Sequence, residues 1–119
     1  MLFHLKQGDL RTPLLFQASQ QLDIDLTFSK IHFIMTDQYA KRIIIDEIAT
    51  LIETETLSYT FKQGQTDEVG LFLGEFEIHH INNTIENFPR DGYITIVIHP
   101  SLRSNGFTPS LIIDGGVFK

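Results

Sequence analysis

The chain contains no cysteine and no tryptophan, and it has no long apolar run. Without thiols, disulfide frameworks, thiolate metal sites and cysteine nucleophiles are excluded. No apolar run approaches the ~18 residues that a membrane span needs. The amino terminus, Met-Leu-Phe-His-Leu-Lys, lacks the basic-then-apolar pattern of a signal peptide. We therefore expect a soluble, cytoplasmic protein that does not associate with membranes.

Catalytic signatures are also missing. Ser101 and Ser104 lie in no G-x-S-x-G motif, and the five histidines show no H-x-H, H-x₃-H or H-E-x-x-H spacing. No glycine cluster stands at a strand-to-helix junction, where a phosphate loop would lie. No stretch carries a motif that is typical of a known family. These absences favour a protein that is not an enzyme and needs no cofactor.

Basic charge is scarce in the middle of the chain. The 119 residues carry a net charge of −6, and residues 46–91 hold ten acidic against only two basic side chains. The segments on either side are each close to neutral. Such a chain has no electrostatic reason to approach a phosphate backbone, which disfavours nucleic-acid binding.

Length and an apolar content of 42% predict a single domain over residues 1–119.

The most informative stretch is 68–81, which we predict to be the longest and most central strand. Phe72, Phe76 and Ile78 recur at the period-2 spacing that points side chains to one face of a sheet. Gly74 lies between them and indicates a bulge or close packing against an aromatic ring. The opposite face begins apolar and then turns polar.

Alternation of apolar and polar residues predicts several further strands. Residues 93–99 are the clearest, because Ile94, Ile96 and Ile98 share one face. The polar loop 62–67 predicts that the strand before it, 57–61, forms an antiparallel hairpin with 68–81. The other predicted strands cover residues 2–5, 24–28, 31–35 and 111–113.

Two segments fit a helical period instead. Residues 13–22 begin with Pro13, the imino acid favoured at the first helical position, and Thr12 precedes them as a cap residue. Residues 37–53 carry an apolar arc that includes Ile48, opposite a polar stripe formed by Arg42, Asp46, Thr50 and Glu53. The competing interpretation of 37–53 is extended, because the run Ile43-Ile44-Ile45 is β-branched. The predicted fold is α+β: an antiparallel sheet of five or six strands with two helices (13–22 and 37–53) packed on one face.

The polar face of the 68–81 strand is the first candidate site. Glu75, Glu77 and His79 are spaced about 6.5–7 Å apart along the strand, and both residue types bind divalent metals or transfer protons. One strand cannot surround a metal, so His99 or His4 would have to complete the site. The same pattern is more typical of the solvated face of an antiparallel sheet.

Two functional hypotheses follow. The first is an acidic protein-binding module, similar in role to an immunity protein, antitoxin or inhibitor, that captures a basic partner. Its candidate binding residues come from the acidic segment and from the long loop 100–109: Asp46, Glu53, Glu75, Glu77, Arg103 and Asn105. The alternative is a small-molecule- or metal-binding protein, conceivably an enzyme, that uses Glu75, Glu77, His79 and His99. Homo-oligomerisation stays open under either hypothesis.

Overall fold

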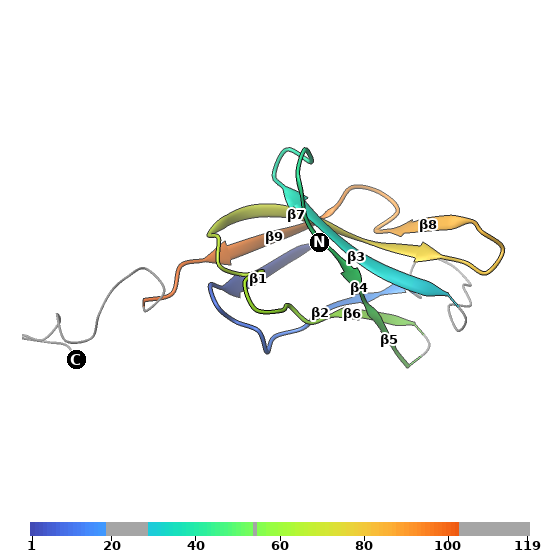
Figure 1. The fold of residues 1–119 in the computed structure, drawn as a ribbon, viewed down its shortest axis with the longest axis horizontal. Coiled ribbons are helices and arrows are strands. Elements are labelled where there is room, and N and C mark those ends of the chain that lie inside the picture. The colour runs from blue at the N-terminus through green and yellow to red at the C-terminus, as the bar shows by residue number, and fades with distance from the viewer. Residues whose placement is uncertain (19–28, 54, 103–119) are drawn as a thin grey trace, which may run out of the picture.

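Two β-sheets packed face to face form the protein (Figure 1). The computed structural model describes residues 1–18, 29–53 and 55–102, and these contain nine strands. The large sheet has the order β1 (Leu2–Lys6), β9 (Ile94–His99), β7 (Gly70–His79), β3 (Lys30–Asp37) and β4 (Ile43–Ile48), with β8 (Ile85–Phe88) paired to β7. The small sheet has the order β2 (Leu14–Gln17), β6 (Thr56–Tyr59) and β5 (Thr50–Ile52).

Strand β7 is the centre of the large sheet, as its sequence predicts. It pairs antiparallel with β3 from Phe72 to His79. Its other edge is shared, because β9 pairs with Gly70–Gly74 and β8 pairs with Phe76–His79. Buried and less buried side chains alternate along β7, with Phe72, Phe76 and Ile78 pointing into the core. The strand therefore holds three neighbours in register and presents its opposite face outward.

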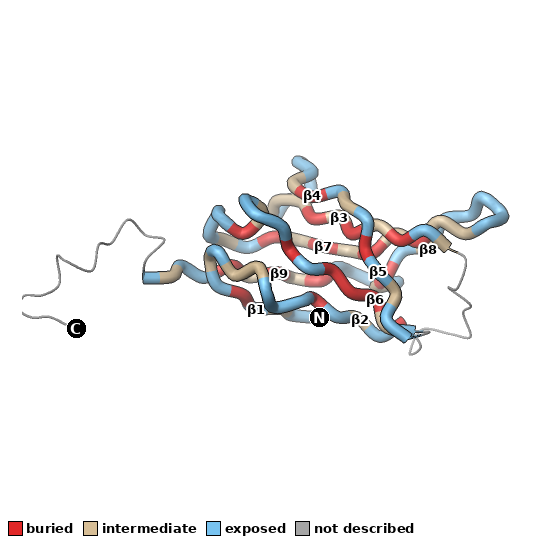
Figure 2. Tube along the Cα trace, turned by 60° about the horizontal axis from the view of Figure 1, so that its bottom comes forward, coloured by how far each residue is buried: buried red, intermediate tan, exposed pale blue. Residues whose placement is uncertain are grey.

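The core lies between the two sheets, where Figure 2 shows the buried segments of both facing each other. The ring of Phe33 on β3 stacks on Tyr59 of β6, with the ring centroids 4.6 Å apart, and contacts Phe76 of β7 at 5.3 Å. Such aromatic pairs contribute energy beyond the area they bury. The predicted apolar faces of β3 and β9 are confirmed, because their residues are at most 5% exposed: Ile31, Phe33, Met35, Ile94, Ile96 and Ile98.

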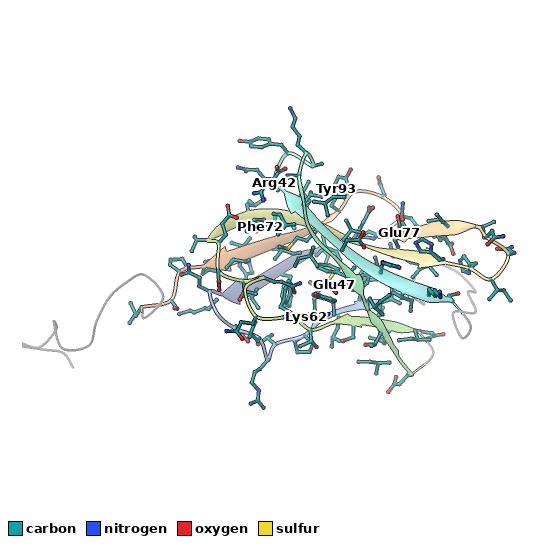
Figure 3. The ribbon with its side chains drawn as sticks, viewed as in Figure 1. Arg42, Glu47, Lys62, Phe72, Glu77 and Tyr93 are labelled. Atoms are coloured by element: carbon teal, nitrogen blue, oxygen red, sulfur yellow. The ribbon has the colours of Figure 1, made fainter. Side chains whose placement is uncertain are left out.

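The chain crosses from the large sheet to the small one at Ala49, between β4 and β5. The buried Ala49 donates its backbone N–H to the carbonyl of Ile31 at 2.8 Å. Nearby, the Lys62 ammonium lies 2.9 Å from the Glu47 carboxylate and connects β4 to the segment after β6 (Figure 3). These contacts fix the small sheet over one face of the large sheet, and within residues 1–18, 29–53 and 55–102 no strand covers the other face.

The predicted α+β class is wrong, since no helix occurs among the residues that the structure describes. Within the predicted helix 13–22, Leu14–Gln17 form β2 and pair with β6, while residues 19–22 lie outside the described residues. The short apolar run Leu-Leu-Phe fits both periods, so pairing with a neighbouring strand decides its conformation. The described residues accordingly contain no helix that could cross a membrane.

The predicted helix 37–53 is wrong as well, and its extended alternative is right. Its residues form the end of β3, a turn, β4 and β5. Ile45 is only 2% exposed, whereas Ile48, assigned to the apolar helical arc, is 61% exposed. A spacing of four is a multiple of the strand period as well as close to the helical one, so the polar stripe did not discriminate between them. Arg42 lies 3.9 Å from Glu68 and forms no pair with Asp46.

Two further strand predictions need correction. The segment 57–61 contributes β6 to the small sheet and does not form a hairpin with β7. Residues 85–88, which are not among the predicted strands, form β8 and pair with β7. The predicted strands at 24–28 and 111–113 lie outside the described residues. The corrections for 57–61 and 85–88 both concern which strands pair, a property that alternation within a strand does not encode.

Candidate functional site

The candidate site is the uncovered side of the large sheet, which we call the outer face. On β7 it carries Glu75, Glu77 and His79, each partly buried, in alternation with the core residues. The prediction that these three side chains share one face is therefore confirmed. Leu71 and Leu73 extend the outer face along β7. Neighbouring strands complete it with residues whose side chains alternate with buried ones: His32, Ile34, Thr36, Ile43, Asp46, Ile48, Thr95 and Val97.

Strand register arranges these side chains in rows across the sheet. One row runs from Glu75 on β7 through Ile34 on β3 to Asp46 on β4. The next row contains Glu77 and His32, which lie directly opposite each other on β7 and β3. Side chains directly opposite each other on paired strands have Cβ atoms about 4.5–5.5 Å apart. Asp46 thus joins the site from β4 because that segment is a strand.

Two of the three carboxylates on the outer face have histidine partners. His32 Nδ1 lies 3.1 Å from Asp46 Oδ1, and His79 Nε2 lies 2.8 Å from Glu77 Oε1. Because a carboxylate only accepts hydrogen bonds, each of these ring nitrogens carries the proton. The two imidazole rings are 5.0 Å apart. Asp46, Glu77 and the two histidines therefore form one connected polar cluster.

Glu75 is different, because it has no hydrogen-bond or ion-pair partner among the described residues. Burial, and after it the charge of Glu77, raise the pKa of the Glu75 carboxyl above its ordinary value. Its neighbours across the sheet and along the strand are apolar or of the same charge. A carboxylate in this position lacks the compensating positive charge that partly buried carboxylates usually have.

A cavity of about 160 Å³ lies next to Glu75. Its wall is formed by β3, β7, the turn after β3 and the residue before β9: Ile34, Thr36, Ala40, Leu73, Gly74, Glu75 and Tyr93. Among the described residues that line it, Glu75 is the only charged one. The Tyr93 side chain is 50% exposed and lies, like Glu77, on the side of the large sheet that faces away from the small sheet (Figure 3).

The part of the outer face around this cavity is apolar. Leu73 and Ile34 are partly exposed, and Leu71 and Ile43 are exposed. An antiparallel sheet commonly presents polar residues on its solvated side, so exposed leucine and isoleucine side chains on several neighbouring strands are unusual. The outer face thus combines an apolar area, a single unpaired carboxylate and the polar cluster next to it.

The predicted metal set does not come together. His99 lies just beyond Ile98, which pairs with Gly70 at the far end of β7, so the strand rise separates it from His79 by about 30 Å. His99 is bonded to His4 instead, with Nδ1 of His4 2.8 Å from its Nε2. Within the described part of the chain, no group of three or more histidine and acidic side chains is arranged to hold a metal ion.

The remaining predicted binding residues lie elsewhere. Glu53 follows β5 in the small sheet, with a backbone φ of 60°, and does not belong to the outer face. Arg103 and Asn105 lie outside the described residues. Sequence reasoning missed His32, Ile34 and Tyr93 as members of the site. Alternation indicated that His32 points away from the core, but only the pairing of β3 with β7 brings it next to Glu77.

A second polar cluster joins the start of β3 to the β7–β8 hairpin. His80 Nε2 lies 2.7 Å from Glu86 Oε1, and its Nδ1 lies 3.2 Å from the Ser29 hydroxyl. The other oxygen of Glu86 binds Arg90. His80 is thus a hydrogen-bonded histidine at the edge of the core. Because Glu86 contacts both His80 and Arg90, we interpret this cluster as a structural connection.

Comparisons with known proteins are sparse. The chain matches no protein-family model and no curated protein. Among solved structures, it is similar to the crystal structure of CopC from Methylosinus trichosporium OB3b, with a TM-score of 0.48 and 12% sequence identity over 82% of this chain and 83% of that one. A likeness this distant supports no statement about function, so the proposals below depend on the residues of this chain alone.

Proposed function

We propose that this protein is a protein-binding module whose outer face captures a basic partner. The observation that carries the proposal is Glu75: a partly buried carboxylate with no partner among the described residues, next to an apolar cavity. An isolated carboxylate in such surroundings costs free energy, and a cation from another molecule would offset that cost. A partner with a positive charge and an apolar surface fits both features.

The charge of the outer face supports a basic partner. Asp46, Glu75 and Glu77 lie in neighbouring rows of β4 and β7. Negative potential on a binding surface accelerates encounter with a positively charged partner and excludes acidic ones. Lys30, opposite His79, stands at the end of the cluster remote from Glu75.

The apolar part of the outer face supports a protein as the partner. Interfaces contain an apolar centre with polar and charged groups around it. Leu71, Leu73 and Ile43 provide such a centre, and all three come from strands of the large sheet. Strand β7 is paired on both sides and β4 is paired with β3, so the surface is organised before the partner arrives.

The proposal is tested by the association rate of a purified partner, obtained first by affinity capture. We expect association to slow as salt increases, because charges separated by more than the Debye length of ~8 Å are screened at physiological ionic strength. Glu75→Lys and Leu73→Asp should each abolish binding. Glu53→Lys changes the net charge as much as Glu75→Lys but lies away from the outer face, so it should leave binding intact.

Two results would contradict the proposed function. The first is a partner whose binding ignores both salt and the Glu75→Lys and Leu73→Asp variants. The second is self-association alone, seen as a dimer by sedimentation, with no basic partner. In that case the outer face would be covered by a second copy of this chain.

A further inference from the structure

We propose that the cavity beside Glu75 receives a single primary amine, the side chain of one lysine of the basic partner. This inference deepens the proposed function and depends on it for the origin of the amine. The cavity itself is a property of this chain, so the binding of a free amine can be tested without the partner.

The shape and lining of the cavity match a chain that is apolar along its length and charged at its end. Ile34, Ala40 and Leu73 contribute apolar walls to a volume of about 160 Å³. Lysine carries a stem of four methylene groups, which packs on apolar surface while the ammonium reaches a polar partner. Glu75, the only charged residue of the lining, supplies that partner. The half-exposed ring of Tyr93 offers an aromatic surface to the same cation.

The number of hydrogen-bond acceptors favours an ammonium over a guanidinium. Besides the Glu75 carboxylate, the cavity side chains offer the hydroxyls of Thr36 and Tyr93. The Thr36 hydroxyl donates its own hydrogen to the Asp37 carbonyl and so keeps its oxygen free to accept. An ammonium has three donors, whereas a guanidinium has five in a fixed planar array. The larger group would leave more donors unpaired in a partly apolar site, and each unpaired donor weakens binding.

The neighbouring carboxylates do not provide an equivalent site. Asp46 and Glu77 are each bonded to a histidine, so a cation there would compete with an existing contact. Glu75 has no such contact among the described residues. The amine is therefore assigned to Glu75 and not to the polar cluster as a whole, and Glu53, which lies away from the outer face, serves as the matched control.

The test uses n-butylammonium, which reproduces the end of a lysine side chain, added to the whole chain and followed by NMR. We expect saturable shifts of Leu73, Ile34 and Tyr93 resonances, and none of that size with neutral n-butanol. Glu75→Gln should weaken binding about tenfold to a hundredfold, the effect of losing one hydrogen bond to a charged group. Glu53→Gln should change it little, because Glu53 follows β5 in the small sheet and does not line the cavity.

A second readout follows the Glu75 carboxyl carbon. Bound ammonium favours the ionised carboxylate, so saturating n-butylammonium should lower the pKa of Glu75 toward its ordinary value, whereas n-butanol should not. A folded-state spectrum of each variant shows whether a loss of binding reflects the missing carboxylate or a change in fold.

The inference is overturned by equal binding of n-butanol, by unchanged binding in Glu75→Gln, or by no saturable shift at all. Tighter binding of n-butylguanidinium would replace lysine with arginine. These outcomes are separable from failure of the proposed function. If the partner needs Glu75 but the amine does not bind, only the cavity assignment fails. If the amine binds but no basic partner uses the outer face, the proposed function fails.

Discussion

The two faces of β7 share one backbone and the same strand partners but have different chemistry. Toward the core, Phe72, Phe76 and Ile78 are at most 4% exposed and pack against both sheets. On the outer face, Glu75 and Glu77 alternate with them and stay partly exposed. The inner side chains stabilise the fold by burial, whereas Glu75 is a charge that the fold does not compensate. The comparison indicates that one face of the strand maintains the structure and that the other is available for binding.

The same contrast between an inner and an outer face applies to β4, and it predicts the largest difference in stability. A carboxylate is introduced on each face of this strand in turn. Ile45→Asp puts an unpaired charge into the core and should cost about 3–5 kcal/mol or prevent folding. Ile48→Asp adds the same side chain at a position that is 61% exposed and should cost no more than about 1 kcal/mol. Urea unfolding of both variants measures the difference. Equal, large losses would instead support the helical arrangement of 37–53.

A smaller effect is expected at Gly74, on the inner face. A Cβ at this position would lie 2.8 Å from Cδ1 of Ile96 and 3.2 Å from the ring of Phe33. Gly74→Ala should therefore cost about 1–3 kcal/mol by overpacking. Ile96→Val removes the nearest atom, so the double variant should lose less stability than the two single variants added together. Denaturant unfolding of this cycle checks the contact, and simple additivity would contradict it.

The smallest effect is expected on the outer face, where Glu75→Gln should stabilise the protein near neutral pH. The folded state raises the pKa of Glu75, so folding favours the protonated carboxyl. Below the ordinary pKa the carboxyl is protonated in both states and contributes nothing. As pH rises through the raised pKa, the ionised carboxylate lowers the free energy of unfolding.

Thermal melts should therefore show Glu75→Gln melting above the unmodified protein at about pH 7 and level with it at about pH 3. The same variant should bind the basic partner less well. A gain in stability together with a loss of binding is expected where a residue serves function at the expense of the fold. A variant that is less stable at both pH values would show that Glu75 has a stabilising contact.

Much of the fold was predictable wherever the pattern had a single period. Residues 93–99 and 68–81 alternate over six or more positions, and the buried side chains of β9 and β7 are the predicted ones. The closeness of Gly74 to Phe33 was likewise expected from a glycine inside an apolar strand. In these stretches apolar residues occupy every second position, so the sequence alone predicts which face of the strand is buried.

The sequence by itself thus determined the strands of strong alternation, the core faces of β3, β7 and β9, and the shared face of Glu75, Glu77 and His79. Only the tertiary structure decided that Leu14–Gln17 and Ile43–Ile48 are strands, because short apolar runs and four-residue spacings fit both periods. It also decided that Glu75 lies opposite Ile34 while Glu77 lies opposite His32. Those neighbours come from residues more than forty positions apart, and register between distant strands depends on the packing of the whole sheet.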